Sequence, residues 1–408
     1  MKITCIGGGP ANLYFAILMK LQDPSHDLTV HERDPAGSTY GWGVTYWAPL
    51  LARLRTHDPE SADHLRTHSV RWTDGSAHLR GRTTVHHGDE GFGIGRHRLL
   101  DLLAARASAL GVALAYEDEV PADGPLPEAD LVVAGDGVHS AVRARHPDHY
   151  GSALTHGRNR YLWLGTTKVF DSFTFAFVET DHGWIWSYGY AYDTDRSTFV
   201  VECAPRTWTG LGLDRATETD GRAVLEKLFA DVLDGQPLIG RSAGSGSAQW
   251  LSFRTLTNRT WHRGNTVLLG DAAHTTHYSI GAGTTLALED ACALAESLHT
   301  HGAGHDPAAL PAALTAYERR RRGELLHVQS AARHSAQWYE NLTRYIDLPP
   351  ERMFALLGQR HSPLLPYVPP QLYYHLDRAA GQVEALRRLK RWLGPRLARN
   401  LHAARTPH

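Results

Sequence analysis

The chain has few cysteines and no long apolar run. Its three cysteines, Cys5, Cys203 and Cys292, lie far apart and form no Cys-x-x-Cys pair, which argues against a disulfide framework and favours a reducing compartment. No apolar run reaches the length of about 18 residues that suggests a membrane helix. The N-terminus leads directly into an apolar strand, without the pattern of a signal peptide. We therefore expect a soluble, cytoplasmic protein that does not bind a membrane.

Net charge is almost absent as well. The formal net charge of −1 at pH 7 gives no reason to expect nucleic acid as a partner. The chain is long, however, and its 408 residues are enough to bury a large core in a layered fold of one or two domains.

A glycine-rich turn lies near the N-terminus. Residues 2–6 resemble a short apolar strand, residues 7–12 a turn, and residues 13–19 the start of a helix whose free amides would bind a pyrophosphate. Glu32 ends the next apolar strand about 20 residues later, where a ribose diol needs an acceptor. Asn12 stands where the third glycine of the pattern is expected, so the helix and the strand must accommodate a side chain there. The pattern predicts a dinucleotide-binding unit.

A second glycine-rich segment, late in the chain, predicts a flavin site. Residues 267–269 resemble a buried strand, Gly270 permits a sharp exit, and the Asp271 carboxylate is suited to the hydroxyls of a ribityl chain. Gly281 and Gly283 allow the backbone to approach a flat ring, and the helix that follows directs its positive N-terminal end toward that ring.

A third element lies between these two. Residues 130–137 resemble a strand followed by a turn, which places Asp136 beneath a cofactor. A helix is expected over residues 97–110. Arg96, just before it, is suited to a pyrophosphate or to a salt bridge at the helix end.

The middle of the chain predicts an antiparallel sheet. Residues 161–202 are rich in Trp, Phe, Tyr, Thr and Val, with turns near residues 171, 181–183 and 193–196. Only one face of such a sheet can meet a ligand, so the pattern leaves open which aromatic side chains line a pocket. The candidates are Phe175, Phe177, Trp184, Trp186 and Tyr188, most of which we expect to lie in the core.

The C-terminal part is expected to be helical. Residues 308–345 carry apolar residues at helical spacing, and prolines at 349–350 and 363–370 interrupt the pattern. A basic helical tail follows, which is either a solvated face or a patch for a CoA diphosphate or an acidic carrier protein. Its basic residues are Arg387, Arg388, Lys390, Arg391, Arg396 and Arg399.

The order of these elements resembles that of the group A flavoprotein monooxygenases, the relatives of p-hydroxybenzoate hydroxylase. The resemblance covers most of the chain and implies an α/β fold, in which a Rossmann-like FAD-binding domain is interleaved with an antiparallel β-sheet substrate domain and followed by a helical C-terminal region. The implied divisions are FAD-binding parts at 1–78, 88–155 and 249–305, substrate-sheet parts at 79–87 and 156–248, and the helical region at 306–408. The resemblance also implies FAD as cofactor, NADH or NADPH and dioxygen as co-substrates, and hydroxylation of an aromatic ring by a C4a-hydroperoxyflavin.

Less generic segments are similar to the salicyloyl-CoA 5-hydroxylases and 2-aminobenzoyl-CoA monooxygenases. These segments are residues 41–44 (GWGV), 58–61 (DPES), 91–96 (GFGIGR), 163–168 (WLGTTK), 253–255 (FRT) and 274–281 (HTTHYSIG). Most group A enzymes have prolines where this chain has His277 and Tyr278, whereas this branch usually has His and Phe. The chain departs from the branch at Thr285, where lysine is usual, and at the aromatic residues 184–186. The similarity implies an aryl thioester of CoA or of a carrier protein as substrate.

The expected site residues follow from the motifs and the resemblance together. His277 and Tyr278 are predicted to be catalytic, by hydrogen-bonding the substrate or assisting proton transfer; alternatively, His277 only satisfies buried backbone in place of the missing prolines. His274 is expected to be structural, and Arg254 to pair with an internal acid more readily than with a ligand. No metal is expected, because His274 and His277 lack a third ligand at suitable spacing. FAD is expected to be bound by Gly7, Gly9, Pro10, Ala11, Asn12, Glu32, Arg33, Gly43, Val44, Arg96, Asp136, Asp271, Gly281, Ala282, Gly283 and Thr284.

Three other functions were weighed from the residues. A flavin halogenase is disfavoured, because only the first half of its Trp-x-Trp-x-Ile-Pro segment occurs, at residues 184–186, and no lysine lies between Lys20 and Lys168. A hydroxylase of a free aromatic or indole compound remains open. A non-catalytic flavin binder also remains, and it predicts no substrate-stimulated oxidation of NAD(P)H. The enzyme is expected to be a monomer or a homodimer.

Overall fold

The computed structural model describes residues 1–38, 41–240 and 249–382. The basic residues predicted in the tail lie outside these ranges. No helix within the described residues is both long and apolar enough to cross a membrane.

A six-stranded sheet forms one part of the molecule, with the order β14-β15-β7-β1-β2-β6. All neighbours in it are parallel except β14 and β15. Short apolar strands that are buried on both faces are typical of such parallel sheets. The strands are β1 (Lys2–Ile6), β2 (Asp27–Glu32), β6 (Ala113–Tyr116), β7 (Leu131–Ala134), β14 (His262–Arg263) and β15 (Thr266–Leu268).

Helices pack around this sheet and supply much of its core. The first, α1, is buried along nearly its whole length and packs against α10 and α4. The helix predicted at 97–110 is confirmed as α4, displaced by one residue. The helices of this part are α1 (Pro10–Gln22), α2 (Ala48–His57), α3 (Pro59–Thr67), α4 (Arg96–Ala109), α5 (Ala141–Ala144), α6 (Pro147–Tyr150) and α10 (Gly283–Thr300).

A nine-stranded sheet forms the other part, with the order β12-β8-β11-β10-β9-β4-β5-β3 and with β13 paired to β8. The predicted meander is confirmed, since β8, β11, β10 and β9 pair antiparallel. One pair, β4 with β9, is parallel, because the chain returns to the sheet after passing through the first part. The strands are β3 (Gly43–Trp47), β4 (Val70–Leu79), β5 (Arg82–Gly95), β8 (Ala153–Thr166), β9 (Phe173–Thr180), β10 (Gly183–Ala191), β11 (Ser197–Cys203), β12 (Leu238–Ile239) and β13 (Leu251–Thr257).

The nine-stranded sheet extends beyond the predicted substrate segment 79–87. The hairpin of β4 and β5 spans residues 70–95, and β3 joins its edge, so sheet pairing reaches into both neighbouring segments. Pairing in one sheet does not by itself define a domain, and the division into domains stays a prediction.

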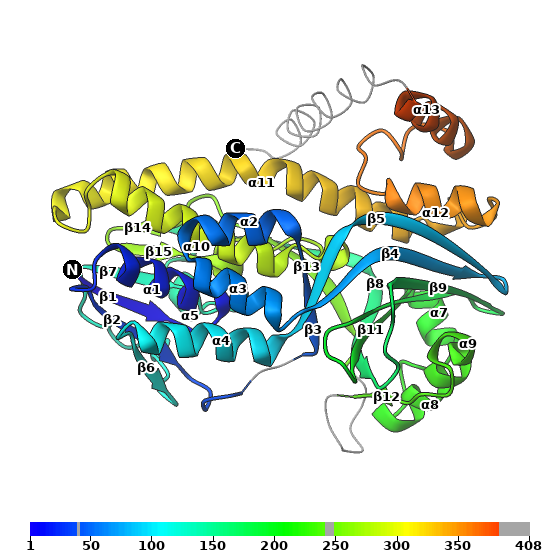
Figure 1. Cartoon of the computed structure of the whole chain (residues 1–408), viewed down its shortest axis with the longest axis horizontal. Coiled ribbons are helices and arrows are strands. Elements are labelled where there is room, and N and C mark those ends of the chain that lie inside the picture. Colours follow the sequence, from blue (N-terminus) through cyan, green and yellow to red (C-terminus); the bar gives the residue numbers. More distant parts are fainter. Residues whose placement is uncertain (39–40, 241–248, 383–408) are drawn as a thin grey trace.

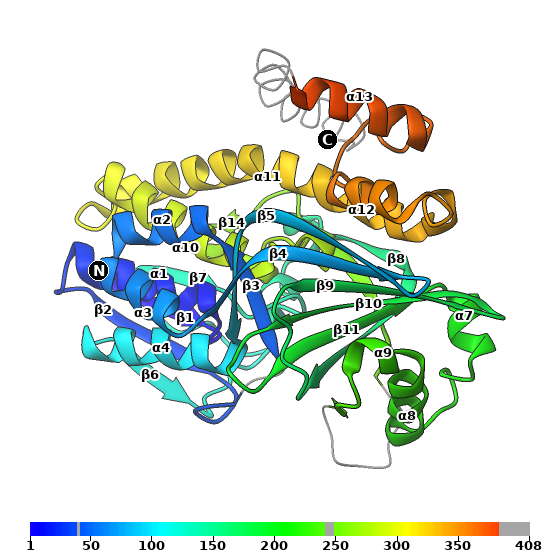
Figure 2. The same cartoon turned by 45° about the vertical axis from the view of Figure 1, so that its right-hand side comes forward.

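Both faces of this sheet are covered by helices, as Figure 2 shows. One face packs against the end of α11 and against α12, and the other packs against α8 and α9. The long helix α11 crosses both parts of the molecule (Figure 1), in agreement with the helical stretch predicted at 308–345. These helices are α7 (Pro205–Gly210), α8 (Glu218–Leu228), α9 (Ala230–Leu233), α11 (Leu310–Glu340), α12 (Pro350–Gly358) and α13 (Pro370–Gln382).

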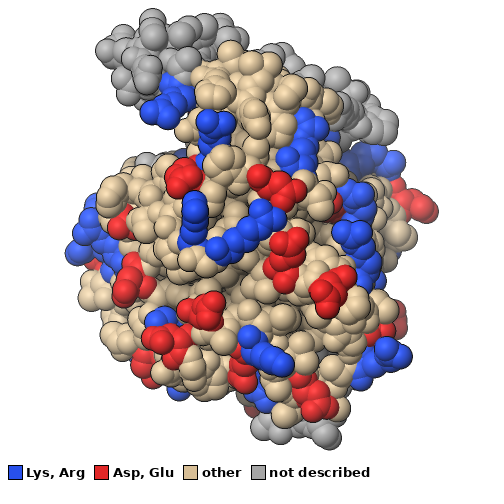
Figure 3. Space-filling model, turned by 90° about the vertical axis from the view of Figure 1, so that its right-hand side faces the viewer, with Lys and Arg blue, Asp and Glu red and all other residues tan. Residues whose placement is uncertain are grey.

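The surface at the end formed by the large sheet carries charges of both signs. Figure 3 shows lysine and arginine side chains interspersed with aspartate and glutamate on this face. Among the described residues drawn there, neither sign forms a continuous surface.

Candidate cofactor and substrate site

The three predicted cofactor segments meet at one edge of the six-stranded sheet. Strands β1, β2, β7 and β15 are parallel, so their carboxyl ends lie together. The glycine-rich turn follows β1, Glu32 ends β2, Asp136 follows β7 and Asp271 follows β15. This edge is where ligands bind in open α/β sheets.

The turn after β1 depends on two glycines from different segments. Gly7 has a φ of +99°, and a Cβ on it would lie 2.7 Å from the carbonyl oxygen of Gly135. Asn12 is fully buried, and its side-chain amide donates to the carbonyl oxygens of Ile6 (2.9 Å) and Gly7 (2.8 Å). Gly135 leaves space for that amide, since a Cβ there would lie 2.7 Å from it. Asn12 thus holds the turn with its side chain, which explains how the chain accommodates it in place of glycine.

Glu32 closes the same turn from the neighbouring strand. Its carboxylate accepts hydrogen bonds from the backbone N–H of Gly8 (2.6 Å) and of Asp34 (2.9 Å). Each oxygen keeps a second lone-pair position, which suits the ribose diol that the sequence predicts. Arg33, beside it, is largely exposed, and its nearest acid is Asp34 at 3.9 Å.

A buried acid fixes the turn after β15. Asp290 of α10 accepts hydrogen bonds from the backbone N–H of Gly270 (3.2 Å) and from Nε2 of His274 (2.8 Å). Arg143 donates to the carbonyl oxygen of Ala272 from the other side (2.9 Å). His274 therefore lies in a structural position, as the sequence suggests.

With the turn held in this way, Asp271 faces a cavity. Desolvation by the surrounding protein raises the pKa of its carboxyl group, while His274 and Arg96 oppose that shift. Hydroxyl groups of a ligand would satisfy such a carboxylate without adding charge.

The cavity has a volume of about 520 Å³ and lies between the two sheets. Backbone and small side chains form one side, and aromatic rings form much of the other. The residues on the first side are Gly43, Val44, Thr45, Val138, Asp271, Gly281, Gly283 and Thr284. The rings are those of Trp47, Tyr161, Trp163, Phe173, Tyr188, Tyr190, Phe253 and Tyr278.

Glycine is required at two positions on the first side. Gly281 has a φ of +62°, and a Cβ on it would lie 2.6 Å from the hydroxyl oxygen of Thr45. A Cβ on Gly43 would lie 2.4 Å from the Tyr192 side chain. Both glycines therefore allow the backbone beside the cavity to pack closely against neighbouring side chains.

Of the five aromatic residues predicted for the pocket, only Tyr188 lines the cavity. Phe175, Phe177 and Trp186 share its sheet face but are buried in a core cluster with residues of α11 and α12. Trp184 lies at the far end of β10, under the guanidinium of Arg80. Most of the candidates thus lie in the core, as expected, because helices cover one half of the face, and strand periodicity does not reveal which half.

The two predicted catalytic residues occupy different environments. Tyr278 lines the cavity and stacks on Phe253 (ring centroids 4.1 Å apart), and its buried hydroxyl has no partner within the described structure. His277 is buried behind it, with Nδ1 2.9 Å from the Ser279 hydroxyl. Burial lowers the pKa of His277 to about 3, so its ring is neutral near pH 7.

Two arginines that line the cavity have no acid partner among the described residues, Arg254 and Arg360. The expectation of an internal acid for Arg254 was wrong, because its Nη1 lies 2.8 Å from Nε2 of His139. Arg360 follows α12, in a proline-interrupted region where no motif marks it. Arg360 reaches the cavity only because the C-terminal helices pack on the sheet.

The residues at this site fit FAD. The turn after β1 and the start of α1 suit a pyrophosphate, Glu32 a ribose, Asp271 a ribityl chain, and the backbone near Gly43 and Gly281 a flat ring. Within residues 1–38, 41–240 and 249–382, no three His, Cys, Asp or Glu side chains lie close enough to bind a metal ion.

Comparison with known proteins agrees with that fit. Residues 124–331 match the family described as an FAD binding domain. Salicyloyl-CoA 5-hydroxylase of Streptomyces sp is 36% identical over 368 residues, which cover 88% of this chain and 69% of that protein. The 3-hydroxy-4-methyl-anthranilyl-(aryl-carrier protein) 5-monooxygenase of Streptosporangium sibiricum is 36% identical over 360 residues, 88% of this chain and 94% of that protein. Protodeoxyviolaceinate monooxygenase of Chromobacterium violaceum is 30% identical, covering 90% and 96%.

Solved structures share the fold at low sequence identity. The 2-methyl-3-hydroxypyridine-5-carboxylic acid oxygenase has a TM-score of 0.69 and 19% identity, covering 88% of this chain and 96% of that chain. The p-nitrophenol 4-monooxygenase of Pseudomonas putida has a TM-score of 0.66 and 18% identity, covering 92% and 97%. The α/β fold with an interleaved sheet is confirmed, and FAD as cofactor is confirmed by the family.

Proposed function

This chain belongs to the FAD-dependent aromatic monooxygenases, and we propose that its substrate is an aryl thioester carried by CoA or by a carrier protein. Two relatives that are each 36% identical act on such thioesters, by their names. The observation that carries the proposal is the cavity, which is lined by aromatic rings and also by Asp271 and Gly281. Such a lining suits a flat acyl ring beside the cofactor.

Bound FAD supplies the redox chemistry, with electrons from NADH or NADPH and with dioxygen as oxidant. The turn after β1, Glu32, Arg96 and Asp271 would hold the cofactor. The rings of Phe253, Tyr161 and Tyr278 exclude water and hold the substrate ring in place, which favours oxygen transfer over loss of peroxide.

His277 and Tyr278 are proposed to orient the substrate. Tyr278 offers a buried hydroxyl to the cavity, and burial raises its pKa well above the ordinary value, so the group stays a proton donor. His277 is neutral and positions the loop through Ser279. We therefore propose that Tyr278 contacts the substrate and is the catalytic residue. His277 is proposed to position the loop that carries Tyr278.

A steady-state experiment tests the proposal. The purified holoenzyme is supplied with NADH or NADPH and with 2-hydroxybenzoyl-CoA, 2-aminobenzoyl-CoA or the two free acids, and the products are identified by mass spectrometry. We expect nucleotide oxidation and the gain of one oxygen atom with a thioester only. Turnover of the free acids alone would contradict the thioester, and no stimulation by any aromatic compound would favour a non-catalytic flavin binder.

A second candidate is a hydroxylase of a free aromatic or indole compound. It is favoured by the 30% identity to protodeoxyviolaceinate monooxygenase, whose name includes no thioester. The free-acid arm of the same experiment, extended to indole carboxylic acids, distinguishes the two. A cytoplasmic location and a monomer or homodimer complete the proposal.

A further inference from the structure

Arg360 holds an unneutralised positive charge at the wall of the cavity. It follows α12 and is half-buried. Its Nε donates to the Ser335 hydroxyl (3.1 Å), its Nη1 to the carbonyl oxygen of Leu357 (2.9 Å) and its Nη2 to the carbonyl oxygen of Ser279 (3.0 Å). None of the described carboxylates lies within 4.0 Å of it.

The guanidinium still has capacity to bind. A guanidinium has five N–H groups, and these contacts use three, which leaves one on each terminal nitrogen. The carbon Cζ lies 5.9 Å from the ring centroid of Phe175 and 6.0 Å from that of Tyr339. Such rings attract the cation, but they supply no negative oxygen, and the half-buried charge can still gain from a counter-charge or further hydrogen bonds. The position thus favours a ligand that supplies a negative or polarised oxygen.

Two other donors with unused capacity line the same cavity. The hydroxyls of Tyr188 and Tyr278 are buried and have no hydrogen-bond partner in the described structure. Their ring centroids are 5.6 Å apart, and that of Tyr188 is 6.1 Å from Phe175, the ring beneath Arg360. One of the two carbonyl oxygens that Arg360 binds belongs to Ser279, the residue after Tyr278. Unsatisfied polar groups that gather in an apolar cavity mark the place of ligand polar atoms.

We propose that Arg360, together with the hydroxyls of Tyr188 and Tyr278, is the polar anchor of the aromatic substrate and binds an oxygen attached to its ring system. That oxygen is either an ionised ring hydroxyl or the acyl carbonyl, since both accept from a guanidinium. The class of substrate in this inference is taken from the proposed function. The inference adds that Arg360, which no sequence motif marks, determines the affinity for that substrate.

The orientation of Arg360 is linked to the predicted catalytic loop. The Ser335 hydroxyl accepts from both Arg360 and the Ser279 hydroxyl (2.7 Å), and the Ser279 hydroxyl contacts His277. A continuous chain of hydrogen bonds therefore runs from His277 to Arg360. It fixes the guanidinium plane before a substrate binds, which lowers the ordering cost of binding.

Ligand affinity in the FAD-loaded enzyme tests the proposal. The variants are Arg360→Met, which removes charge and donors, and Arg360→Gln, which keeps donors for the neighbouring carbonyls but no charge. Arg352→Met, on the preceding helix α12 but stacked on Tyr374 outside the cavity, is the matched control. The ligands are the 2-hydroxybenzoyl and benzoyl thioesters of pantetheine and its S-benzyl thioether, which has no acyl or ring oxygen. Flavin absorbance reports binding, and flavin content with the melting temperature reports folding.

We expect both Arg360→Met and Arg360→Gln to lower the affinity for the 2-hydroxybenzoyl thioester by about 10- to 100-fold, which is the effect of losing a charge-assisted hydrogen bond. The affinity for the thioether should not change. An equal loss for the plain benzoyl thioester identifies the acyl carbonyl as the bound oxygen, and a loss confined to the hydroxybenzoyl ligand identifies the ring hydroxyl. Unchanged affinities, or equal losses for all three ligands, would overturn the anchor.

The outcome for Arg360 is separate from that for the proposed function. If the parent enzyme binds no pantetheine ligand, the thioester proposal fails, and 2-hydroxybenzoate and toluene then replace the ligands in the same comparison. A selective loss of 2-hydroxybenzoate affinity still supports the anchor. A parent enzyme that binds neither compound refutes it.

Discussion

At the scale of single residues, Asp271 is the residue of the late glycine-rich segment that we propose to bind the ribityl chain of FAD. Its carboxylate faces the cavity from a turn that Asp290 and Arg143 hold in place. We predict that Asp271→Ala yields largely flavin-free protein, because the ribityl hydroxyls lose their acceptor. Asp123→Ala, an exposed aspartate, is the control. The ratio of flavin absorbance to protein measures the effect, and stoichiometric yellow flavin in Asp271→Ala would refute the role.

His277 separates cofactor binding from substrate orientation. We predict that His277→Ala keeps its FAD but loses about 10- to 100-fold in hydroxylation, or releases hydrogen peroxide instead, because the loop that carries Tyr278 is no longer held. Peroxide and hydroxylated product are measured together, with the exposed His305→Ala as control. Unchanged turnover and coupling would return His277 to a purely structural role. Because its pKa is about 3, no titration of His277 is expected in the activity profile at neutral pH.

The residue scale also shows what sequence patterns cannot supply. The face of the large sheet was recognisable by alternation, since Phe175, Phe177, Trp186 and Tyr188 do share it. Which of them meets a ligand depends on where α11 and α12 cover that face. Arg360 was not predictable for the same reason, because only tertiary packing brings it to the cavity.

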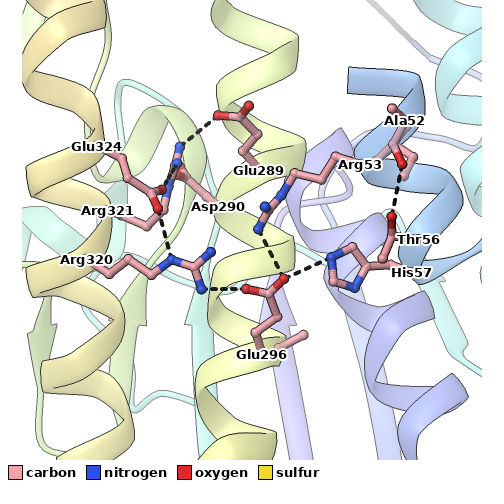
Figure 4. A network of polar contacts seen from close by, with 12 residues as sticks. Ala52, Arg53, Thr56, His57, Glu289, Asp290, Glu296, Arg320, Arg321 and Glu324 are labelled. Atoms are coloured by element: carbon pink, nitrogen blue, oxygen red, sulfur yellow. Dashed lines mark hydrogen bonds and ion pairs between the residues drawn. The ribbon is translucent and has the colours of Figure 1, made fainter. Parts of the chain in front are cut away.

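At the scale of elements, charge pairs tie α10 to its neighbours, as Figure 4 shows. Arg321 of α11 pairs with the buried Asp290 (2.7 Å) and also with Glu289 and Glu324. Glu296 of α10 pairs with Arg53 and His57 of α2. We call the ion pairs between Arg321 of α11 and helix α10 the brace. Since Asp290 also holds the turn that carries Asp271, this brace reaches the predicted cofactor site.

Removing the cation of this brace is predicted to be costly. Arg321→Met leaves Asp290 as a buried charge without its guanidinium partner, and we expect a loss of about 3–5 kcal/mol in unfolding free energy together with weaker FAD retention. The exposed Arg319→Met, on the same helix, should change little. Denaturant unfolding followed by fluorescence measures both. Equal stability of the two variants would show that the pair contributes little.

A second brace predicts how stability depends on pH. Burial alone would raise the pKa of Glu318 in α11, but hydrogen bonds from His262, the Trp261 N–H and Thr260 outweigh it and lower the pKa to about 2. A carboxyl group with a lowered pKa stabilises the folded state fully at pH values above the ordinary glutamate pKa of 4.5. This contribution is lost as the pH falls toward 2. Its size is on the order of 3 kcal/mol.

We therefore predict that Glu318→Gln is less stable than the parent protein at pH 7 and that the difference shrinks between about pH 4.5 and pH 2. Melting temperatures across this range measure it, and Glu351→Gln, an exposed glutamate, provides the baseline. A difference that stays constant with pH would contradict the assignment to ionised Glu318.

Elements were predictable where a pattern was local. The strand and turn at residues 2–12, the helix near residue 97 and the meander from residue 161 were all recognisable from spacing. The parallel pairing of β4 with β9 was not, since it joins residues about 100 positions apart and no local pattern encodes it. The reach of the large sheet beyond residues 79–87 has the same origin.

At the scale of the whole molecule, function depends on how the two sheets meet. The cofactor edge lies on one sheet, the aromatic wall on the other, and α11 spans both (Figure 1). The cavity exists only in the assembled fold, which is why local sequence motifs mark the edge of the six-stranded sheet but not the aromatic wall. The central claim is that an aryl thioester fills this cavity beside the flavin.

Anaerobic reduction of the bound flavin tests that claim most directly. The rate with NADH and with NADPH is followed by flavin absorbance in the presence of 2-aminobenzoyl and 2-hydroxybenzoyl thioesters of CoA and pantetheine, and of the free acids. The account predicts that thioesters accelerate reduction and that free acids do not. Acceleration by free acids or indoles alone would contradict the thioester, and the aromatic hydroxylase would remain.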